Sequence, residues 1–445
     1  MMKREIIVNL LYNLGGRSEV ERYLREYTQP GAARTAVVKI GGALIRDDLD
    51  DLSSSVAFLK HIGMAPVVVH GAGPQLSAEL DEGGVVSEWV DGLRVTTPEV
   101  LAAAHRMFVR EGSRLGEAID AHGVRARTIP TGVFEVVADD PERLGLVGRV
   151  VRVDLKPVRA ALDAGYLPVL SPLGVTVDGQ MLNVNADTAA RALAEALKPG
   201  KVIYLTETGG IFDEHGRVIS AINIEQDRER LVASGVVSGG MARKIEEIGV
   251  LLAALPGQAT VSITKPAHLA RELFTHKGSG TLVRRGASIQ VVDDLAGLDE
   301  ARLVGLLESS FGRALVPGYL DSVRGAKALI APYTALAIVR ETGIGAYLDK
   351  FAVTAEAQGA GVGAALWDRL VREHPRLYWR SRVGNPINPW YMQRADGMQR
   401  TENWLVFWRG LVAGEDVLGA IRTASGEPAS FVDAKPLAAE GAGLV

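Results

Sequence analysis

A lysine beside two glycines is the first feature of this chain that could do chemistry. Residues 35–40 form a short apolar run typical of a buried strand, with Lys39 near its carboxyl end and Gly41 and Gly42 directly after it. Glycine lets backbone amides approach a ligand closely, and parallel sheets bind ligands outside the carboxyl ends of their strands. The stretch therefore indicates a phosphate site, with a solvated lysine before an ordinary turn as the alternative.

Further polar and glycine-rich motifs stand where predicted strands end or predicted helices begin. They are Gly71-Ala72-Gly73, Arg94, Asn183 to Asp187, Thr206 to Gly210 and, at 238–244, a Ser-Gly-Gly turn with Lys244 one helical turn later. Asn185 could cap the next helix, with Asp187 in its first turn. The motif at 71–73 is not a dinucleotide fingerprint, because Leu76 occupies the position of the third glycine, and the chain has no Walker A sequence.

The elements that must position these residues alternate along the chain. From 35 to 285, apolar strands such as 66–70, 201–206 and 259–264 alternate with helical patterns such as 186–197 and 241–255, and 134–153 has the pattern of a local hairpin. Such alternation predicts an α/β fold with a mostly parallel sheet and helices on both faces. The composition changes at 286–298, which we interpret as a linker. We expect a smaller α/β domain at 299–413 and a poorly ordered tail at 414–445.

The first thirty residues predict a kinked helical arm. Ile6, Ile7, Leu10, Leu11 and Leu14 fall on one helical face, and Val20, Tyr23, Leu24 and Tyr27 form the apolar side of a second segment after a Gly-Gly pair. Asparagines interrupt the first apolar patch and no small-residue cleavage site follows it, so we do not interpret it as a signal peptide.

The composition of the chain excludes several classes of function. Of the 445 residues, 47% are apolar and 23% charged, and the net charge of −4 with a pI near 6.1 argues against a nucleic-acid or anionic-membrane surface. There is no cysteine, which excludes disulfides and thiol chemistry. We expect a cytoplasmic protein of two or three domains with no metal site of its own.

Together and in this order, the motifs of 35–285 resemble the amino acid kinase family, and specifically its N-acetylglutamate kinases. The resemblance implies a three-layer αβα fold in which ATP, carried with Mg²⁺, phosphorylates N-acetylglutamate. It implies that Lys39 and Lys244 flank the transferred phosphoryl group and that Asp187 orients them. By the same resemblance the phosphate-binding and nucleotide-binding positions are Gly41, Gly42, Gly71, Gly73, Thr206, Gly209 and Gly210, and Arg94 and Asn183 bind N-acetylglutamate.

Such a reaction depends on positioning and charge. The attacking carboxylate is ionised at pH 7 and needs no general base, and two lysines, amide donors and Mg²⁺ can neutralise the phosphoryl group. The chain departs from the family at Ala72, where many of these kinases have a glycine. A methyl group there could alter the approach of the phosphate.

Residues 272–283 resemble the loop that binds feedback arginine in arginine-sensitive kinases, which also have an N-terminal helical arm. The resemblance implies L-arginine as an effector, with Glu272 pairing with its guanidinium and with Gly278 and Gly280 in the loop. The alternative is an ordinary amphipathic helix that ends at a glycine.

The second half has one glycine-rich helix start, at 358–363, whose amides could bind a pyrophosphate. Its glycines also satisfy the spacing G-x-G-x-x-A, so a dinucleotide site is a competitor. Against it, five residues separate the preceding strand from the first glycine, and the next strand ends without an acidic residue for a ribose. The pattern is instead similar to the coenzyme A loop of GNAT acetyltransferases, which implies that coenzyme A binds at Gln358, Gly359, Gly361, Val362 and Gly363.

The flanking sequences YLDKFAVT and YWRSRVGNPINPWY are similar to the acetyltransferase domain of vertebrate-like N-acetylglutamate synthases, over about 298–411. The resemblance implies transfer of an acetyl group from acetyl-CoA to L-glutamate. Tyr391 matches a proposed catalytic tyrosine and could protonate the departing thiolate, and Arg313, Arg382 and Asn385 match glutamate-binding positions. Core packing is the alternative for Tyr391, and it is the interpretation we favour for Trp379, Trp404 and Trp408.

The two resemblances together imply a homo-oligomeric chain that makes N-acetylglutamate and then phosphorylates it, the first two steps toward arginine. Three alternatives remain open. The chain could be a synthase whose kinase fold senses arginine, with Ala72 as the only support. It could be a kinase with a degenerate acetyltransferase half, or a non-catalytic arginine-binding scaffold.

Overall fold

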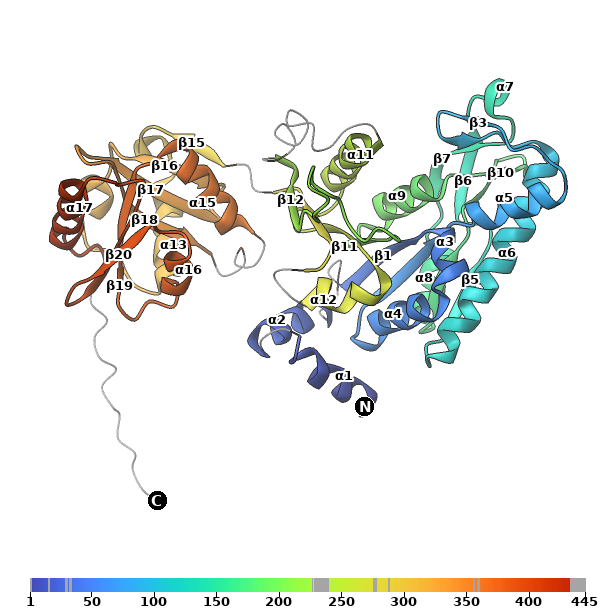
Figure 1. The fold of residues 1–445 in the computed structure, drawn as a ribbon, viewed down its shortest axis with the longest axis horizontal. Helices are drawn as coiled ribbons and strands as arrows, with labels where there is room; N and C mark the ends of the chain where they lie inside the picture. The colour runs from blue at the N-terminus through green and yellow to red at the C-terminus, as the bar shows by residue number, and fades with distance from the viewer. Residues whose placement is uncertain are drawn as a thin grey trace, which may run out of the picture. The chain divides into compact units, whose positions relative to one another are not determined.

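The computed structural model describes residues 2–14, 17–28, 31, 34–225, 227, 240–274, 278–286, 289–354, 357 and 361–432. The chain divides into two compact units, Met1–Arg285 and Gly286–Val445 (Figure 1). Each unit has its own central sheet, so each is described by itself.

An eight-stranded sheet forms the centre of the first unit. Its strands in spatial order are β12 (Ala221–Asn223), β14 (Thr281–Arg284), β13 (Thr260–Thr264), β11 (Lys201–Leu205), β1 (Thr35–Ile40), β2 (Ala65–His70), β8 (Leu167–Leu170) and β5 (Ala126–Ile129). Neighbouring strands are parallel except β13 and β14. Such a sheet is buried on both faces, which explains the continuous apolar runs of its central strands.

Helices cover both faces of this sheet (Figure 1). Val37 of β1 packs into a core with the helices α8 (Lys156–Asp163), α9 (Ala186–Leu197) and α11 (Gly240–Ala254). Ala36 and Val38 face the opposite core, with α3 (Gly42–Asp47), α4 (Leu49–His61), α6 (Pro98–Ala121) and α12 (Leu269–Phe274). The predicted three-layer αβα arrangement with a mostly parallel sheet is confirmed.

Smaller elements complete the first unit. The predicted hairpin consists of β6 (Phe134–Ala138) and β7 (Gly148–Val153), and it joins β9 (Leu173–Val175) and β10 (Met181–Asn183) in a separate four-stranded sheet. The other elements are α5 (Gly73–Glu82), α7 (Pro141–Leu144), the hairpin β3 (Trp89–Val90) and β4 (Leu93–Arg94), and the 3₁₀ turn η2 (Pro266–His268).

The amino-terminal arm consists of α1 (Met2–Leu11) and α2 (Arg17–Thr28), and it packs on its own unit. The Tyr27 hydroxyl donates to the Leu273 carbonyl at 2.8 Å, and the Tyr27 ring packs edge-on against Phe274. The predicted apolar face of α1 was partly wrong, because Leu11 is buried whereas Leu10 and Leu14 are exposed.

The second unit is built on a seven-stranded sheet. Its strands in spatial order are β15 (Gln290–Val292), β16 (Lys327–Ala331), β17 (Ala335–Glu341), β18 (Ala346–Val353), β19 (Leu377–Arg382), β21 (Trp404–Arg409) and β20 (Gly397–Arg400). β18 and β19 are parallel and pair only over 346–348 and 377–379, so their carboxyl ends separate. α15 (Val362–Glu373) and α16 (Asn388–Met392) cover one face, and α13 (Glu300–Phe311), α14 (Tyr319–Ser322) and α17 (Gly414–Gly426) cover the other.

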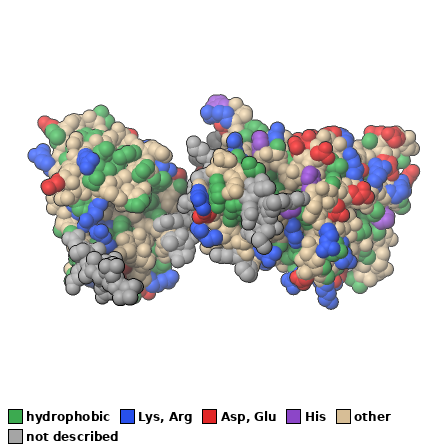
Figure 2. Space-filling view, turned by 90° about the horizontal axis from the view of Figure 1, so that it is seen from below, with side chains coloured by type: hydrophobic (Ala, Val, Ile, Leu, Met, Phe, Trp, Pro, Cys, Tyr) green, Lys and Arg blue, Asp and Glu red, His purple; other side chains and the backbone are tan. Residues whose placement is uncertain are grey.

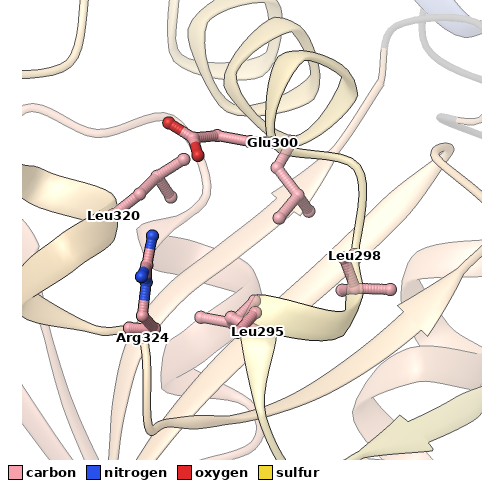
Figure 3. A pocket seen from close by; sticks show the side chains of 7 residues that line it. Leu295, Leu298, Glu300, Leu320 and Arg324 are labelled. Carbon is pink, nitrogen blue, oxygen red and sulfur yellow. The ribbon is translucent and has the colours of Figure 1, made fainter.

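Two predicted boundaries are corrected by this unit. The segment 286–298, interpreted as a linker, contributes β15 and the 3₁₀ turn η3 (Leu295–Gly297). Leu295 and Leu298 line a pocket of about 150 Å³. Figure 3 shows their side chains around it with those of Leu320, Glu300 and Arg324. The tail predicted at 414–445 begins with α17, whose Ala420 and Ala424 are fully buried against the sheet. Burial of apolar surface, which the alanine-rich composition did not reveal, stabilises η3 and α17 in these segments.

The helix lengths and the surface charges bear on two possible features, a membrane-spanning segment and a one-signed charged patch. None of the described helices is long and apolar enough to cross a bilayer. On the face of the first unit in Figure 2, basic and acidic side chains are interspersed.

Candidate active sites

The glycine turns after β1 and β2 lie against each other. The Gly71 amide donates to the Ile40 carbonyl at 2.9 Å. A Cβ atom on Gly42 would lie 2.8 Å from the Cα of Ala72 and 3.0 Å from the Gly73 nitrogen, so only glycine fits this contact. No side chain caps α5, which begins at Gly73, and its first amides therefore remain available to an anionic ligand.

Lys39 and Asp187 form an ion pair beside these turns. The Lys39 Nζ lies 2.9 Å from the Asp187 Oδ1, and their side chains are 15% and 46% exposed. Asn185 caps α9 as predicted, because its Oδ1 accepts from the amides of Asp187 at 2.8 Å and Thr188 at 3.2 Å. A Cβ atom on Gly71 would lie 3.6 Å from the Ala186 Cβ at the start of α9, so the lysine, the carboxylate and the glycine turns share one location.

The third predicted catalytic group of this site is Lys244. Its backbone belongs to α11, but its side chain lies outside the described residues, as do Ser238 and Gly239. Among the described residues, no three His, Asp or Glu side chains gather closely enough to hold a metal ion.

The methyl group of Ala72 does not point at the glycine turns. It is 2% exposed and belongs to an apolar cluster with Leu76 and Leu80 of α5 and with residues of α6. Its φ of −146° suits any L-residue, so the turn does not need a third glycine. The departure from the family pattern therefore leaves the amides beside it in place.

Gln75 is a positioning residue that sequence reasoning missed. Its Nε2 donates to the Gly42 carbonyl at 2.8 Å and to Glu111 Oε2 at 3.4 Å, which holds the first glycine turn against the second. It is 8% exposed. The available signal was a polar residue at a helix position that the neighbouring apolar residues predict to be buried.

Arg94 and Asn183 belong to one hydrogen-bonded network. The Asn183 Nδ2 donates to the Thr96 Oγ1 at 3.2 Å, and that hydroxyl donates to the Arg94 carbonyl at 3.0 Å. The Arg94 guanidinium donates to the hydroxyls of Ser77, at 2.6 Å, and Ser87.

Arg94 retains its charge for a ligand. Burial lowers the pKa of its guanidinium, and the group stacks over the Trp89 ring at 4.5 Å. No carboxylate among the described residues forms an ion pair with it. Arg94 is 6% exposed, its hydrogen-bond partners are hydroxyls, and the Asp81 carboxylate acts on it only through space, so its guanidinium suits an anionic ligand.

The turn after β11 is tightly packed. The Gly209 amide donates to the Thr206 Oγ1 at 3.0 Å. Gly209 has φ +78°, and a Cβ on it would lie 2.5 Å from the Lys265 Cγ. A Cβ on Gly210 would lie 2.8 Å from a Val218 methyl group. These glycines are required by conformation and space, and the turn lies at the same carboxyl edge of the sheet as Lys39.

Glu272 organises the loop before β14. Its buried Oε2 accepts from the amides of Ser279 at 3.0 Å and Gly280 at 2.9 Å. Its Oε1 is buried without a hydrogen-bond partner among the described residues. Gly278 has φ +57°, and a Cβ on Gly280 would lie 2.2 Å from the Ile263 carbonyl oxygen. The loop therefore holds a buried carboxylate, one oxygen of which has no hydrogen-bond partner among the described residues.

In the second unit, α15 begins where β18 and β19 separate. Gly361 has φ +81° and is the N-cap, and a Cβ on Gly363 would lie 3.3 Å from a Val353 methyl group. Gly361, Val362 and Gly363 therefore place a helix N-terminus beside the end of β18. Gln358 and Gly359 lie outside the described residues.

Tyr391 of α16 lies in an aromatic cluster. Its ring packs edge-on against Phe351 and Trp379, with centroids 6.5 and 5.5 Å away. Burial raises the pKa of its phenol far above the usual value, so the hydroxyl keeps its proton at neutral pH. Of the tryptophans expected to pack in the core, Trp379 is 1% exposed, whereas Trp404 is only partly buried and stacks under Arg380 at 4.0 Å.

Arg382 and Asn385 lie in the turn that leads to α16. The Arg382 carbonyl accepts from the Asn385 amide at 3.0 Å and from the Asn388 Nδ2 at 2.8 Å. The third predicted glutamate ligand, Arg313, follows α13, a helix of the opposite face of the sheet. Its half-buried side chain makes no hydrogen bond or ion pair with any other residue that the structure describes. Arg382 and Asn385 are thus together, and Arg313 comes from a different element.

A buried charge cluster on β18 was also missed. The β17–β18 pairing shifts register beside Asp349, a bulge that places Asp349 and Lys350 on the same face. The Tyr319 hydroxyl donates to the Asp349 Oδ1 at 2.7 Å, and Arg340 donates to its Oδ2 at 3.0 Å. Burial alone would raise the pKa of this carboxyl, but Lys350, Tyr319 and Arg340 outweigh it and lower the pKa. Strict alternation along a strand gives no signal of such a bulge.

Comparison with known proteins identifies the two halves. Residues 34–261 match the amino acid kinase family, and residues 289–426 match the N-acetyltransferase of N-acetylglutamate synthase. The chain belongs to the amino acid kinase family. Both predicted domain types are confirmed. The chain is a transferase with a kinase domain and an acyltransferase domain, of a class that acts in arginine biosynthesis.

Named relatives cover nearly the whole chain. An acetylglutamate kinase of Xanthomonas campestris pv. campestris is 46% identical over 410 residues, which is 91% of this chain and 96% of the relative. The mitochondrial N-acetylglutamate synthase of Homo sapiens is 31% identical over 445 residues, covering 94% and 80%. Because relatives of both names match, the comparison does not single out the vertebrate-like group.

The fold is also similar to a solved structure. N-acetylglutamate synthase from Neisseria gonorrhoeae, complexed with coenzyme A and N-acetyl-glutamate, has a TM-score of 0.63 at 22% identity and covers 89% of this chain and 98% of its own. The same enzyme complexed with coenzyme A and L-arginine has a TM-score of 0.57. This similarity supports the order of the two folds along the chain, with the kinase fold first and the acetyltransferase fold second.

Proposed function

We propose that this chain acetylates L-glutamate with acetyl-CoA and phosphorylates the resulting N-acetylglutamate with ATP and Mg²⁺. The observation that carries the kinase half is the Lys39–Asp187 ion pair at 2.9 Å, beside two glycine turns that lead into α3 and α5, whose starts no described side chain caps. The acetyltransferase half rests on the match at 289–426 and on the helix start beside the separating strands.

The kinase half needs no general base, because the attacking carboxylate is already ionised. Lys39, held by Asp187, would neutralise charge on the transferred phosphoryl group, and the amides at Gly42 and Gly73 would bind its oxygens. Lys244 would take the opposite side, and Mg²⁺ would arrive with the nucleotide at Thr206 to Gly210. Arg94 and the Asn183 amide would hold N-acetylglutamate.

The acetyltransferase half needs a proton donor for the departing thiolate. Tyr391 would take this role, since its phenol is protonated at neutral pH, although burial raises its pKa and makes it a weaker acid; water would take the proton from the glutamate amine. The amides at the start of α15 would bind the coenzyme A pyrophosphate. Arg382 and Arg313 would hold the two carboxylates of glutamate, and Asn385 would contribute an amide.

L-arginine is the proposed effector, and its site is the loop of Glu272, Gly278 and Gly280. The buried Oε1 of Glu272, which accepts no hydrogen bond from any residue that the structure describes, supports a guanidinium ligand there. We further propose that the chain assembles as a homo-oligomer. The proposed kinase domain is 31–285, preceded by the arm 1–30.

One experiment tests both halves in sequence. Purified full-length protein would receive glutamate, acetyl-CoA and ATP with Mg²⁺, and hydroxylamine would trap acyl phosphate. We expect the hydroxamate of N-acetylglutamate to form only when acetyl-CoA and ATP are both present. Accumulation of N-acetylglutamate without hydroxamate would contradict the kinase half. Hydroxamate that forms from supplied N-acetylglutamate but not from glutamate and acetyl-CoA would contradict the acetyltransferase half.

A further inference from the structure

The six residues after α17 cross the second unit as a strap, defined here as 427–432. They lie beyond residue 426, where the match to the acetyltransferase family ends. Arg380 fixes their beginning, because its guanidinium donates to the carbonyls of Glu427 and Pro428, both at 2.7 Å. Glu427 is also ion-paired with Arg340 of β17.

The strap then pairs with the loop that carries Arg313. The Val316 amide donates to the Ser430 carbonyl at 3.1 Å, and the Val432 amide donates to the Ala314 carbonyl at 2.9 Å. These bonds close an antiparallel bridge around Leu315 and Phe431. The Phe431 ring packs on Phe311, with centroids 4.6 Å apart. Arg313 is thus held between α13 and a short piece of added strand.

Ser430 also ties the strap to the central sheet. Its Oγ accepts from the Lys350 Nζ at 2.9 Å, and Lys350 is itself paired with Asp349 at the β18 bulge. The Lys350 side chain is 8% exposed. Ser430 therefore connects two parts of the unit. Its side chain binds the buried Lys350 ammonium in the sheet, and its backbone carbonyl binds the Arg313 loop.

We propose that the strap, through Ser430, positions the Arg313 loop and thereby sets the affinity of the acetyltransferase half for its dicarboxylate amino-acid acceptor. This inference rests on the proposed function. A loop that must present a guanidinium to one carboxylate of a small acceptor needs a fixed distance from the sheet. A charge-assisted hydrogen bond to a buried lysine supplies that anchor. Within the part of the chain that the structure describes, the hydrogen bonds, ion pairs and ring contacts of the strap go to the sheet, to α13 and to the Arg313 loop rather than to α15, so we expect coenzyme A binding to change little with the strap.

The test compares Ser430→Ala with Ser430→Thr and Ser309→Ala in the full-length protein. Ser309→Ala is the matched control, because among the described residues its hydroxyl bonds only to the Leu306 carbonyl of its own helix. Initial rates of acetyl transfer give KM for glutamate and for acetyl-CoA. Calorimetry of glutamate binding to the protein saturated with coenzyme A gives a readout that needs no turnover.

We expect Ser430→Ala to raise KM and Kd for glutamate about tenfold, the loss of one hydrogen bond to a charged group. KM for acetyl-CoA should stay within twofold, and Ser430→Thr should restore glutamate binding. If Ser430→Ala leaves the affinity for glutamate unchanged, or raises KM equally for glutamate and acetyl-CoA, the inference is overturned. The proposed function is not affected by that result as long as the wild-type protein transfers the acetyl group. A wild-type protein that neither acetylates nor binds glutamate would overturn the proposed function and this inference together.

Discussion

Replacing Gly42 by alanine should disable phosphoryl transfer and leave acetyl transfer intact. The added Cβ would lie 2.8 Å from the Ala72 Cα, 2.8 Å from the Gln75 Oε1 and 3.0 Å from the Gly73 nitrogen. Two of these contacts are with backbone, so the glycine turns must move apart. Overpacking of this kind costs about 1–3 kcal/mol of stability. A shift of about 1 Å in groups that hold a reacting phosphate costs on the order of 10²-fold in rate.

The assay is hydroxamate formation from supplied N-acetylglutamate and ATP, with glutamate acetylation measured on the same preparation. We expect kcat of the kinase to fall about 10²-fold, while acetylation shows that the protein is folded. Gly257→Ala is the matched control, because a Cβ there meets nothing within 4 Å. A Gly42→Ala protein with wild-type kinase kcat would refute the assignment of the glycine turns to the phosphate.

Three further predictions follow from the geometry. Tyr391→Phe should lower kcat of acetyl transfer at least about 10²-fold, because the proton donor is lost, and equal rates for variant and wild type would remove Tyr391 from the mechanism. Glu272→Gln should raise the arginine concentration for half-maximal effect on the kinase about tenfold or more, and an unchanged arginine titration would exclude this carboxylate as the guanidinium partner. Burial lowers the pKa of His70 to about 4, below the unfolded value of about 6.5, so the unfolded chain takes up the proton first as pH falls. Stability should therefore decrease between pH 6.5 and 4, by up to about 3 kcal/mol, and His70→Gln should flatten this slope in urea unfolding at several pH values.

The local part of this structure could be predicted from the sequence. The run 35–40 and the glycines after it combine strand propensity, burial and turn chemistry within ten residues. Asn185 and Asp187 have the positions expected for a helix start, and the structure places them there. Each of these features depends on neighbours in the chain, which periodicity and capping describe directly.

The unpredicted part depends on contacts between distant residues. Ser430 meets Lys350 eighty positions earlier, and Glu427 meets Arg340. Nothing in the composition of 414–432 marks a segment that completes a loop more than a hundred residues away. The direction of the Ala72 methyl group likewise depends on α6, which packs against α5 from another part of the chain. Such features come from tertiary packing, which overrides local pattern.

The central claim is that Lys39 and Asp187 act together on a transferred phosphoryl group. Its most direct test is the kinase rate on supplied N-acetylglutamate for Lys39→Met, Asp187→Asn and the double variant. We expect losses of about 10²–10³-fold for Lys39→Met and for the double variant alike, with glutamate acetylation retained. A Lys39→Met protein that phosphorylates N-acetylglutamate at the wild-type rate would contradict it.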